Sequence, residues 1–210
     1  MLSLSRLLLR RVFAQANFVY VIHDAETGEA ATVDAAWDTD GILRFVASLG
    51  ASVTAALYTH RHEDHVGGRS PRSGNLRAGA VNMAAAGATV YCMDADADSV
   101  ERSTEALVTR LADGGTVQLG AHTITAIATP GHTPGSCCYL AGTAGGTLES
   151  EVVFTGDTLF GTLRLTLHPP PQIVCAFRTD GSTWHRTRRC LLVCSGWLRK
   201  DVDRGRDGGC

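Results

Sequence analysis

Residues 59–65 of this 210-residue chain read Thr-His-Arg-His-Glu-Asp-His. Three imidazoles and a carboxylate within six positions supply nitrogen and oxygen ligands suited to Zn²⁺ or another borderline divalent metal. Because residues two apart point the same way in extended backbone, we expect His60, His62 and Asp64 to converge and His65 to point elsewhere. A solvated polar loop is the alternative, but the chain holds only eight histidines and such an ordered cluster is rare by chance. The stretch therefore predicts a metal site.

An apolar run at 53–58 leads directly into the cluster and predicts a buried strand. The cluster then lies in a loop at the C-terminal end of that strand, a common place for chemistry in α/β architectures. Alternating strands and helices predict an α/β (α+β) domain. Further strands are expected over 18–23, 30–34, 88–92, 117–119, 122–128, 137–140 and 152–155, and helices after an N-cap at Asp38 and over 99–112.

Two later motifs add one candidate ligand each. His132 lies in the turn Thr-Pro-Gly-His-Thr-Pro-Gly-Ser at 129–136, where Pro and Gly on both sides fix the backbone and aim the side chain. Asp157 follows an apolar strand in Phe-Thr-Gly-Asp-Thr-Leu-Phe at 154–160. Each residue alone is typical of a turn. Together with the cluster, both become candidate metal ligands.

The order of these motifs resembles the metallo-β-lactamase superfamily. Within it, Asn-Phe-Val-Tyr at 17–20, a strand ending at Asp34, Cys-Tyr at 138–139 and Thr-Gly-Asp-Thr-Leu-Phe at 155–160 are similar to the hydroxyacylglutathione hydrolases (glyoxalase II). The likeness covers residues 16–161 and implies an αββα sandwich. It also implies one metal held by His60, His62 and His132, a second held by Asp64 and His65, and Asp157 as the bridge between them.

The resemblance implies hydrolysis of a glutathione thioester to glutathione and a 2-hydroxy acid such as D-lactate, by a metal-bridged hydroxide. Asp64 would be the catalytic residue, both ligand and hydrogen-bond acceptor that orients the hydroxide. The thiolate is a good leaving group, so no general acid is obligatory. Zn²⁺ is the default for both metals, and iron or manganese suits the same ligands.

This sequence departs from the family pattern after the Asp157 motif. The family has a further ligating histidine in a Gly-His-Glu context, whereas His168 and His185, the only later histidines here, match no such motif. The basic and aromatic residues that contact glutathione, and the C-terminal helical domain, have no counterpart. We therefore expect a sandwich that is incomplete in its C-terminal part, and a second metal site without its last histidine.

Residues 162–210 form an atypical Arg/Pro/Gly-rich tail, a candidate for disorder, with nine of the 19 basic residues and four of the 21 acidic ones. We hypothesise that this tail comes from a truncated, alternatively spliced or wrongly predicted reading frame, which sequencing of the transcript tests. Residues 1–15 lack acidic residues and carry three arginines, as in a mitochondrial presequence, although a first strand fits equally well.

Composition narrows the partners and the compartment. A net charge of −2 gives no reason to expect nucleic acid or an anionic membrane, and no apolar run reaches the length of a membrane span. Seven cysteines without a secretory signal favour an intracellular location, mitochondrial matrix or cytoplasm, with mostly buried free thiols. A zinc site at Cys190 and Cys194 is disfavoured by its loose spacing. We expect a monomer whose partner is a small-molecule substrate.

Three other functions compete with the thioester hydrolase. A persulfide dioxygenase of the same superfamily would hold a single iron with His60, His132 and Asp157, a two-histidine, one-carboxylate set. A non-catalytic remnant would explain the missing histidine motif. A hydrolase of lactams, phosphodiesters or lactones would share the metal ligands and differ only in its substrate pocket.

Overall fold

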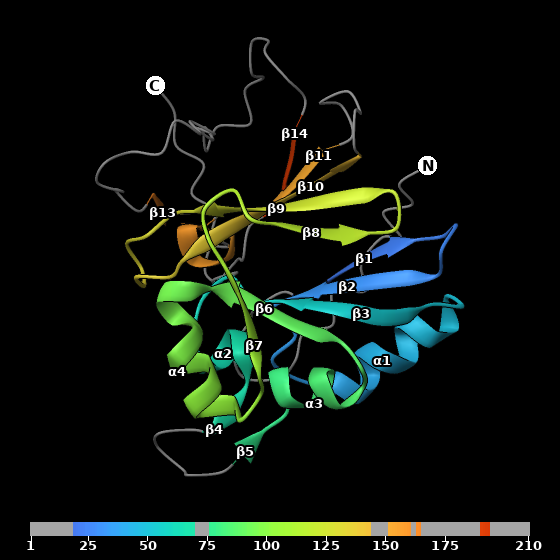
Figure 1. The fold of residues 1–210 in the computed structure, drawn as a ribbon, viewed down its shortest axis with the longest axis horizontal. Coiled ribbons are helices and arrows are strands. Elements are labelled where there is room, and N and C mark those ends of the chain that lie inside the picture. The colour runs from blue at the N-terminus through green and yellow to red at the C-terminus, as the bar shows by residue number, and fades with distance from the viewer. Residues whose placement is uncertain (1–18, 70–75, 144–150, 161–162, 165–189, 194–210) are drawn as a thin grey trace, which may run out of the picture.

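The computed structural model describes residues 19–69, 76–143, 151–160, 163–164 and 190–193. These residues build two five-stranded sheets that lie face to face, and helices cover the outer face of the first sheet (Figure 1). Among the described residues, no α-helix covers the outer face of the second sheet. Three of the four layers of an αββα sandwich are therefore present in the described part, which confirms the predicted fold class.

The first sheet has the strand order β1-β2-β3-β6-β7. Its strands β1 and β2 form an antiparallel hairpin, and the remaining neighbours pair in parallel. Parallel pairing needs crossovers, and the helices supply them on the outer face of the sheet. The bounds are Tyr20–Asp24 for β1, Glu29–Val33 for β2, Ser52–Leu57 for β3, Thr89–Met93 for β6 and Val108–Leu111 for β7.

The second sheet has the order β14-β11-β10-β9-β8 and is antiparallel except for β14 beside β11. The expected hairpin around Gly120 joins β8 to β9, and Gly120 has the positive φ (55°) that a tight turn requires. The bounds are Thr116–Leu119 for β8, His122–Ala128 for β9, Cys137–Thr143 for β10, Glu151–Phe154 for β11 and Cys190–Val193 for β14.

The helices and short elements complete the described part. Helix α1 begins after Asp38, whose side chain accepts from the Gly41 N–H as the predicted N-cap. The α-helices span Thr39–Ser48 (α1), Glu63–Val66 (α2), Ala80–Ala85 (α3) and Asp94–Thr104 (α4). Short strands pair Gly68–Arg69 (β4) with Leu76–Arg77 (β5) and Leu159–Phe160 (β12) with Leu163–Arg164 (β13), and a 3-10 turn, η2, spans Gly156–Thr158.

Two apolar cores hold the layers together, one on each face of the first sheet. Strand β1 contributes to both cores, because its residues are buried on both faces of the sheet. Tyr20 and Ile22 belong to the core between the sheets, whereas Val21 belongs to the core beneath the helices. Three cysteines in the described part, Cys92, Cys137 and Cys138, are buried free thiols, as expected.

The expected helix over 99–112 was wrong in its bounds. Helix α4 ends where Glu105 adopts a left-handed conformation (φ 63°), and residues 108–111 form β7 beside β6. Val108 and Leu111 are the buried positions of β7, and the two residues between them are exposed. Apolar residues three apart imitate a helical face, so backbone pairing with β6 decided the structure instead.

Several sequence predictions fall on the ends of the chain. Residues 190–193 lie in the predicted tail and form β14 beside β11 of the main domain. The presequence or first strand at 1–15, the remainder of 162–210 apart from 163–164, and both His168 and His185 lie outside the described residues. No described helix combines the length and the apolar character that crossing a membrane requires.

Candidate metal centre

Three loops from both sheets meet at one end of the sandwich. The loop after β3 carries His60 and His62, the connection from β9 to β10 carries His132, and the turn after β11 carries Asp157. A backbone hydrogen bond from Cys137 N to Thr59 O (3.0 Å) joins the two sheets at this point. Residues distant in sequence therefore lie close together at this end of the sandwich.

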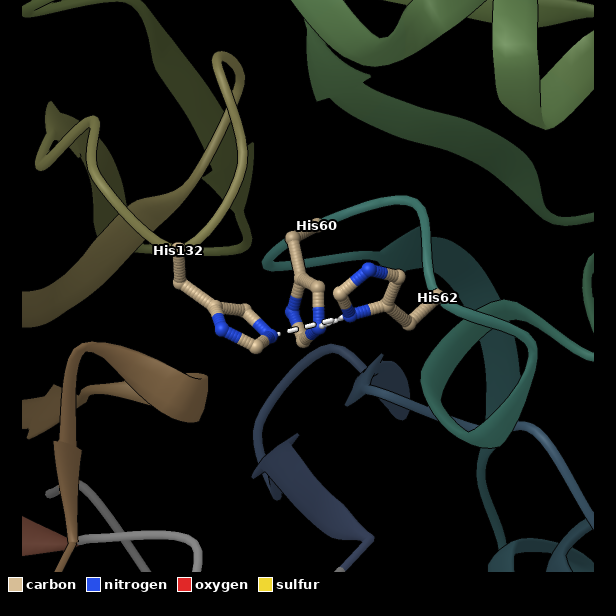
Figure 2. Close-up of side chains that lie close together, drawn as sticks. All are labelled: His60, His62 and His132. Atoms are coloured by element: carbon tan, nitrogen blue, oxygen red, sulfur yellow. Dashed lines mark hydrogen bonds between the residues drawn. The ribbon is translucent and has the colours of Figure 1, made fainter.

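His60, His62 and His132 form a first group of converging imidazoles (Figure 2). His62 Nδ1 lies 3.0 Å from His60 Nε2 and 2.9 Å from His132 Nε2. Nitrogens bound to one tetrahedral Zn²⁺ at about 2.0–2.1 Å would be about 3.3 Å apart, close to these separations. The three nitrogens therefore fit a divalent cation of this type.

His60, His65 and Asp157 form a second group beside the first. Asp157 Oδ1 lies 3.3 Å from His65 Nε2, and Asp157 Oδ2 lies 3.3 Å from His132 Nε2 and 4.0 Å from His60 Nε2. The two oxygens of one carboxylate thus face different groups. This arrangement suits a bridge between two cations.

Among the described residues, Asp64 belongs to neither group of converging ligand atoms, so the expectation that it converges with His60 and His62 was wrong. Helix α2 begins at Glu63, so the alternation of extended backbone ends before Asp64. Asp64 Oδ2 instead lies 3.6 Å from His65 Nε2, on the side of the second group. The proposed pairing of Asp64 with His65 at a second metal is compatible with this position.

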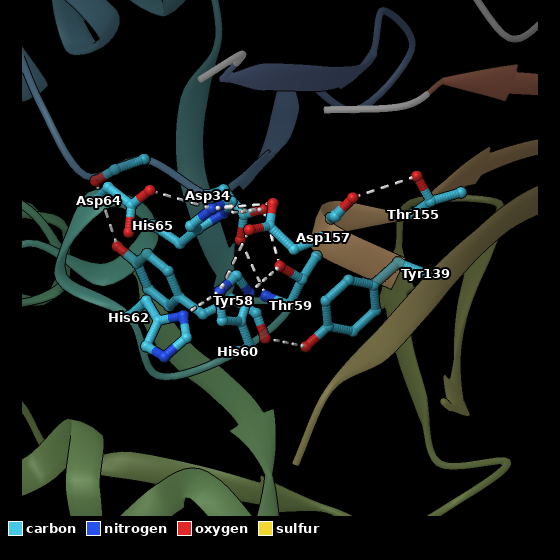
Figure 3. Close-up of polar contacts among 12 residues, drawn as sticks. Asp34, Tyr58, Thr59, His60, His62, Asp64, His65, Tyr139, Thr155 and Asp157 are labelled. Atoms are coloured by element: carbon cyan, nitrogen blue, oxygen red, sulfur yellow. Dashed lines mark hydrogen bonds and ion pairs between the residues drawn. The ribbon is translucent and has the colours of Figure 1, made fainter. Parts of the chain in front are cut away.

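Asp34 lies beside Thr59 and His65, where its carboxylate is in contact with three donors (Figure 3). It follows β2 with φ 56°, and its side chain is almost fully buried. Its carboxylate accepts from Thr59 N (2.8 Å) and Thr59 Oγ1 (2.9 Å), and lies 3.0 Å from His65 Nδ1. The sequence marked Asp34 only as a strand end, because its partners are 25 to 31 residues away.

These contacts define the tautomers of two histidines. The Thr59 hydroxyl donates to Asp34, so its oxygen is left to accept from His60 Nδ1–H, 3.1 Å away. His65 Nδ1 donates to Asp34 in the same way. Both rings therefore turn Nε2 towards the site. Metal-ligating histidines usually have this arrangement, in which the other ring nitrogen donates to an acceptor behind the ring.

Burial and charge shift the histidine pKa values in opposite directions. Burial, reinforced by the charge of His65, lowers the pKa of His60 to about 2. Burial and the neighbouring His132 lower the pKa of His62. Burial alone would lower the pKa of His65, but the charge of Asp34 and the hydrogen bond with Asp157 outweigh burial and raise the pKa of His65. A cation at the second group would replace the Nε2 proton of His65, because ligands bind metals in their deprotonated form.

Close packing explains the glycine before Asp157. Gly156 has φ 47°, and a Cβ there would lie 2.3 Å from Thr59 Oγ1 and 2.6 Å from Thr59 Cβ. Only glycine allows the Asp157 turn to approach the His60 loop this closely.

The turn around His132 is closed by two hydrogen bonds of its own. One runs from Thr129 N to Ser136 O (2.8 Å) and the other from Thr133 N to Ser136 Oγ (2.9 Å).

No protein-family model matches the chain. Among curated proteins, it is 33% identical over 158 residues to a hydroxyacylglutathione hydrolase of Maricaulis maris, covering 75% of this chain and 54% of that protein. It is 32% identical over 145 residues to BaeB of Bacillus velezensis, named a probable polyketide biosynthesis zinc-dependent hydrolase, covering 69% of this chain and 56% of that protein. The chain spans about half the length of these curated relatives.

Solved structures match the same region. ETHE1 from Myxococcus xanthus superposes with a TM-score of 0.54 at 29% identity, over 73% of this chain and 58% of that chain. A metallo-β-lactamase from Staphylococcus aureus superposes with a TM-score of 0.56 at 24% identity, over 69% of this chain and 39% of that chain. The fold and the histidine–aspartate cluster thus define a protein of the metallo-β-lactamase superfamily. Within it, the chain is related to the hydroxyacylglutathione hydrolases at 31–34% identity, which confirms the resemblance of the motifs.

Proposed function

We propose that this protein is a metal-dependent hydrolase of glutathione thioesters, which releases glutathione and a 2-hydroxy acid. One observation carries the proposal: loops from both sheets, together with α2, bring five side chains within reach of two adjacent cation positions, namely His60, His62, His65, His132 and Asp157. The relatives named hydroxyacylglutathione hydrolase support the substrate class. Zn²⁺ is the proposed metal, since three imidazoles suit it.

The donor set fits divalent cations, which when bound would lower the pKa of a water and polarise the substrate carbonyl. His60, His62 and His132 would hold the first cation, and Asp64, His65 and Asp157 the second. Asp34 and Thr59 fix the imidazole planes from behind, so no reorientation is needed when a cation arrives.

The exposure of the site defines the side from which the substrate approaches. The side chains of His60 and His65 are 1% exposed, whereas those of His132 and Asp64 are 27% and 24% exposed. Substrate therefore enters on the side of His132 and Asp64. There the Asp64 carboxylate accepts a hydrogen bond from the attacking water and orients it towards the thioester carbonyl. The thiolate leaves without a proton donor, because thiols are acidic enough to leave as anions.

A second candidate is an iron-dependent persulfide dioxygenase. His132 Nε2 and His60 Nε2 lie 3.3 Å and 4.0 Å from Asp157 Oδ2, which places two imidazoles around one carboxylate. Two histidines and a carboxylate form the usual non-haem iron set. The thioester hydrolase is the main proposal, because the relatives of this chain in sequence are named hydroxyacylglutathione hydrolase.

The deciding experiment is hydrolysis of S-D-lactoylglutathione by the purified full chain reconstituted with Zn²⁺, beside the His60→Ala variant. We expect thioester cleavage by the wild type and loss of at least about 100-fold in kcat/KM for the variant, as expected when a metal ligand is removed. Circular dichroism verifies that the variant is folded.

Two outcomes would overturn the hydrolase. Oxygen consumption with glutathione persulfide by the iron-loaded chain, without thioester cleavage, would support the dioxygenase. Absence of both activities in a folded, metal-loaded chain would support a non-catalytic metal-binding protein.

A further inference from the structure

Asp96 is a buried carboxylate near the metal centre that none of the preceding steps uses. It lies in the first turn of α4 and is 0% exposed. Its Oδ2 accepts from Arg61 N (3.0 Å) and Thr133 Oγ1 (2.6 Å), and its Oδ1 accepts from Gly135 N (3.1 Å) and Arg61 Nη1 (3.2 Å). Four donors therefore converge on one side chain, and three of them are independent of the Arg61 guanidinium.

The donors belong to the two loops that carry the first histidine group. Arg61 lies between His60 and His62, and Thr133 directly follows His132. One carboxylate thus connects the cluster loop of one sheet to the turn of the other. His62 Nδ1 and His132 Nε2, which approach to 2.9 Å, project from the two segments that Asp96 joins.

Packing leaves the His132 turn little freedom to move. A Cβ on Gly135 would lie 2.6 Å from Cβ and Cγ of Asp96 and 2.7 Å from its backbone nitrogen. The turn therefore rests directly on the first turn of α4. A carboxylate is favoured there, because the amino end of a helix carries a partial positive charge.

We propose that Asp96 is a positioning residue that sets the spacing of His62 and His132 and thereby the affinity of the first group for its cation. This inference rests on the metal-binding part of the proposed function and is independent of the thioester substrate. Replacing Asp96 by Asn would direct an NH₂ group at donors that need an acceptor, so the two loops would separate.

The test measures Zn²⁺ affinity of the full chain by competition with a chromophoric chelator, and the visible spectrum of the Co²⁺-loaded form. Asp96→Asn is compared with Asp98→Asn, an exposed aspartate two residues further along α4 that pairs with Arg110. We expect a 10–100-fold loss of Zn²⁺ affinity and an altered Co²⁺ spectrum for Asp96→Asn, of the order found when partners behind metal ligands are removed. Asp98→Asn should match the wild type.

A second pair of variants covers the case in which Asp96→Asn does not fold. Thr133→Val removes the hydroxyl that donates to Asp96, and Thr133→Ser retains it. We expect weaker Zn²⁺ binding for the valine variant and near wild-type binding for the serine variant.

Unchanged Zn²⁺ affinity and an unchanged Co²⁺ spectrum in folded Asp96→Asn or Thr133→Val, even with a lower melting temperature, would reduce Asp96 to a structural role and overturn the inference alone. A wild-type chain that binds no Zn²⁺ would overturn the inference together with the proposed function.

Discussion

At the scale of single residues, Asp34 holds the base of the site together. It accepts from both the backbone and the hydroxyl of Thr59 and pairs with the buried His65. We predict that Asp34→Ala lowers the free energy of unfolding by about 3–5 kcal/mol, because a buried charged partner and two donors lose their acceptor. Urea denaturation of the chelator-treated protein measures this loss.

Asp38→Ala is the matched control. Asp38 is exposed and caps α1 through a single bond to Gly41 N (3.2 Å), so its loss should cost about 1 kcal/mol. Equal losses for the two variants would contradict the role assigned to Asp34.

Asp64 has a different part, in turnover. We predict that Asp64→Asn lowers kcat for thioester hydrolysis by about 100-fold or more, because an amide accepts more weakly from the attacking water and binds a cation less well. The exposed Asp40→Asn on α1 should leave kcat unchanged. Steady-state kinetics on Zn²⁺-loaded enzyme decides this, and a variant affected only in KM would exclude the orienting role of Asp64.

Residues differ in how far the sequence reveals them. The histidines at 60, 62 and 65 are visible because chemistry-bearing residues cluster locally, and His132 because Pro and Gly surround it. Asp34 and Asp96 are not, because a single aspartate carries no sign of partners 25 to 39 residues away. Only the packing of the two loops shows what these carboxylates do.

At the scale of elements, the turn after β11 depends on a close approach to the His60 loop. We predict that Gly156→Ala destabilises the protein and lowers Zn²⁺ affinity by at least about 10-fold, because its Cβ would displace the Asp157 turn from Thr59. Gly50→Ala shares the positive φ (74°) but meets no atom within 4 Å, so it should cost about 1 kcal/mol and leave Zn²⁺ affinity unchanged. Equal Zn²⁺ affinities in the two variants would contradict this account.

Elements were predictable where periodicity and turn chemistry agree. The hairpin at Gly120 and the cap at Asp38 are local features, and both were expected. Strand β7 was not, because Val108 and Leu111 have helical spacing while the pairing that makes them a strand comes from β6. The predicted convergence of Asp64 with His60 and His62 was wrong for a related reason, since α2 interrupts the extended backbone that this prediction assumed.

At the scale of the whole molecule, the buried histidines predict how stability depends on pH. The unfolded pKa of histidine is about 6.5. The folded pKa of His65 is raised, so its contribution is complete below about pH 6.5 and is lost as the pH rises through the folded pKa. The folded pKa values of His60 and His62 are lowered. Below about pH 6.5 these histidines are therefore protonated in the unfolded chain but not in the folded one, and the free energy of unfolding falls as the pH drops.

The metal-free protein should therefore be most stable near neutral pH and lose stability on both sides. Urea unfolding in a chelator at about pH 5, 6.5 and 8.5 tests this prediction. A free energy of unfolding that rises steadily across the three values would show that His65 is not protonated in the folded chain.

The fold class and the ligand motifs could be predicted together from the sequence. The motifs follow one another along the chain in the same order as the loops that meet at one end of the sandwich. The described residues form three layers and both histidine groups. The matched region covers only about half of the length of the curated relatives, so the metal centre is the part of the proposed function that this chain can test by itself.

The most direct test of the central claim is the metal content of the purified full chain, measured by elemental analysis after saturation with Zn²⁺ and exhaustive dialysis. We predict at least one tightly bound Zn²⁺ per wild-type chain and less than one in His60→Ala, since His60 belongs to both groups. A folded wild-type chain that retains no more Zn²⁺ than the variant would contradict the metal centre and the hydrolase built on it.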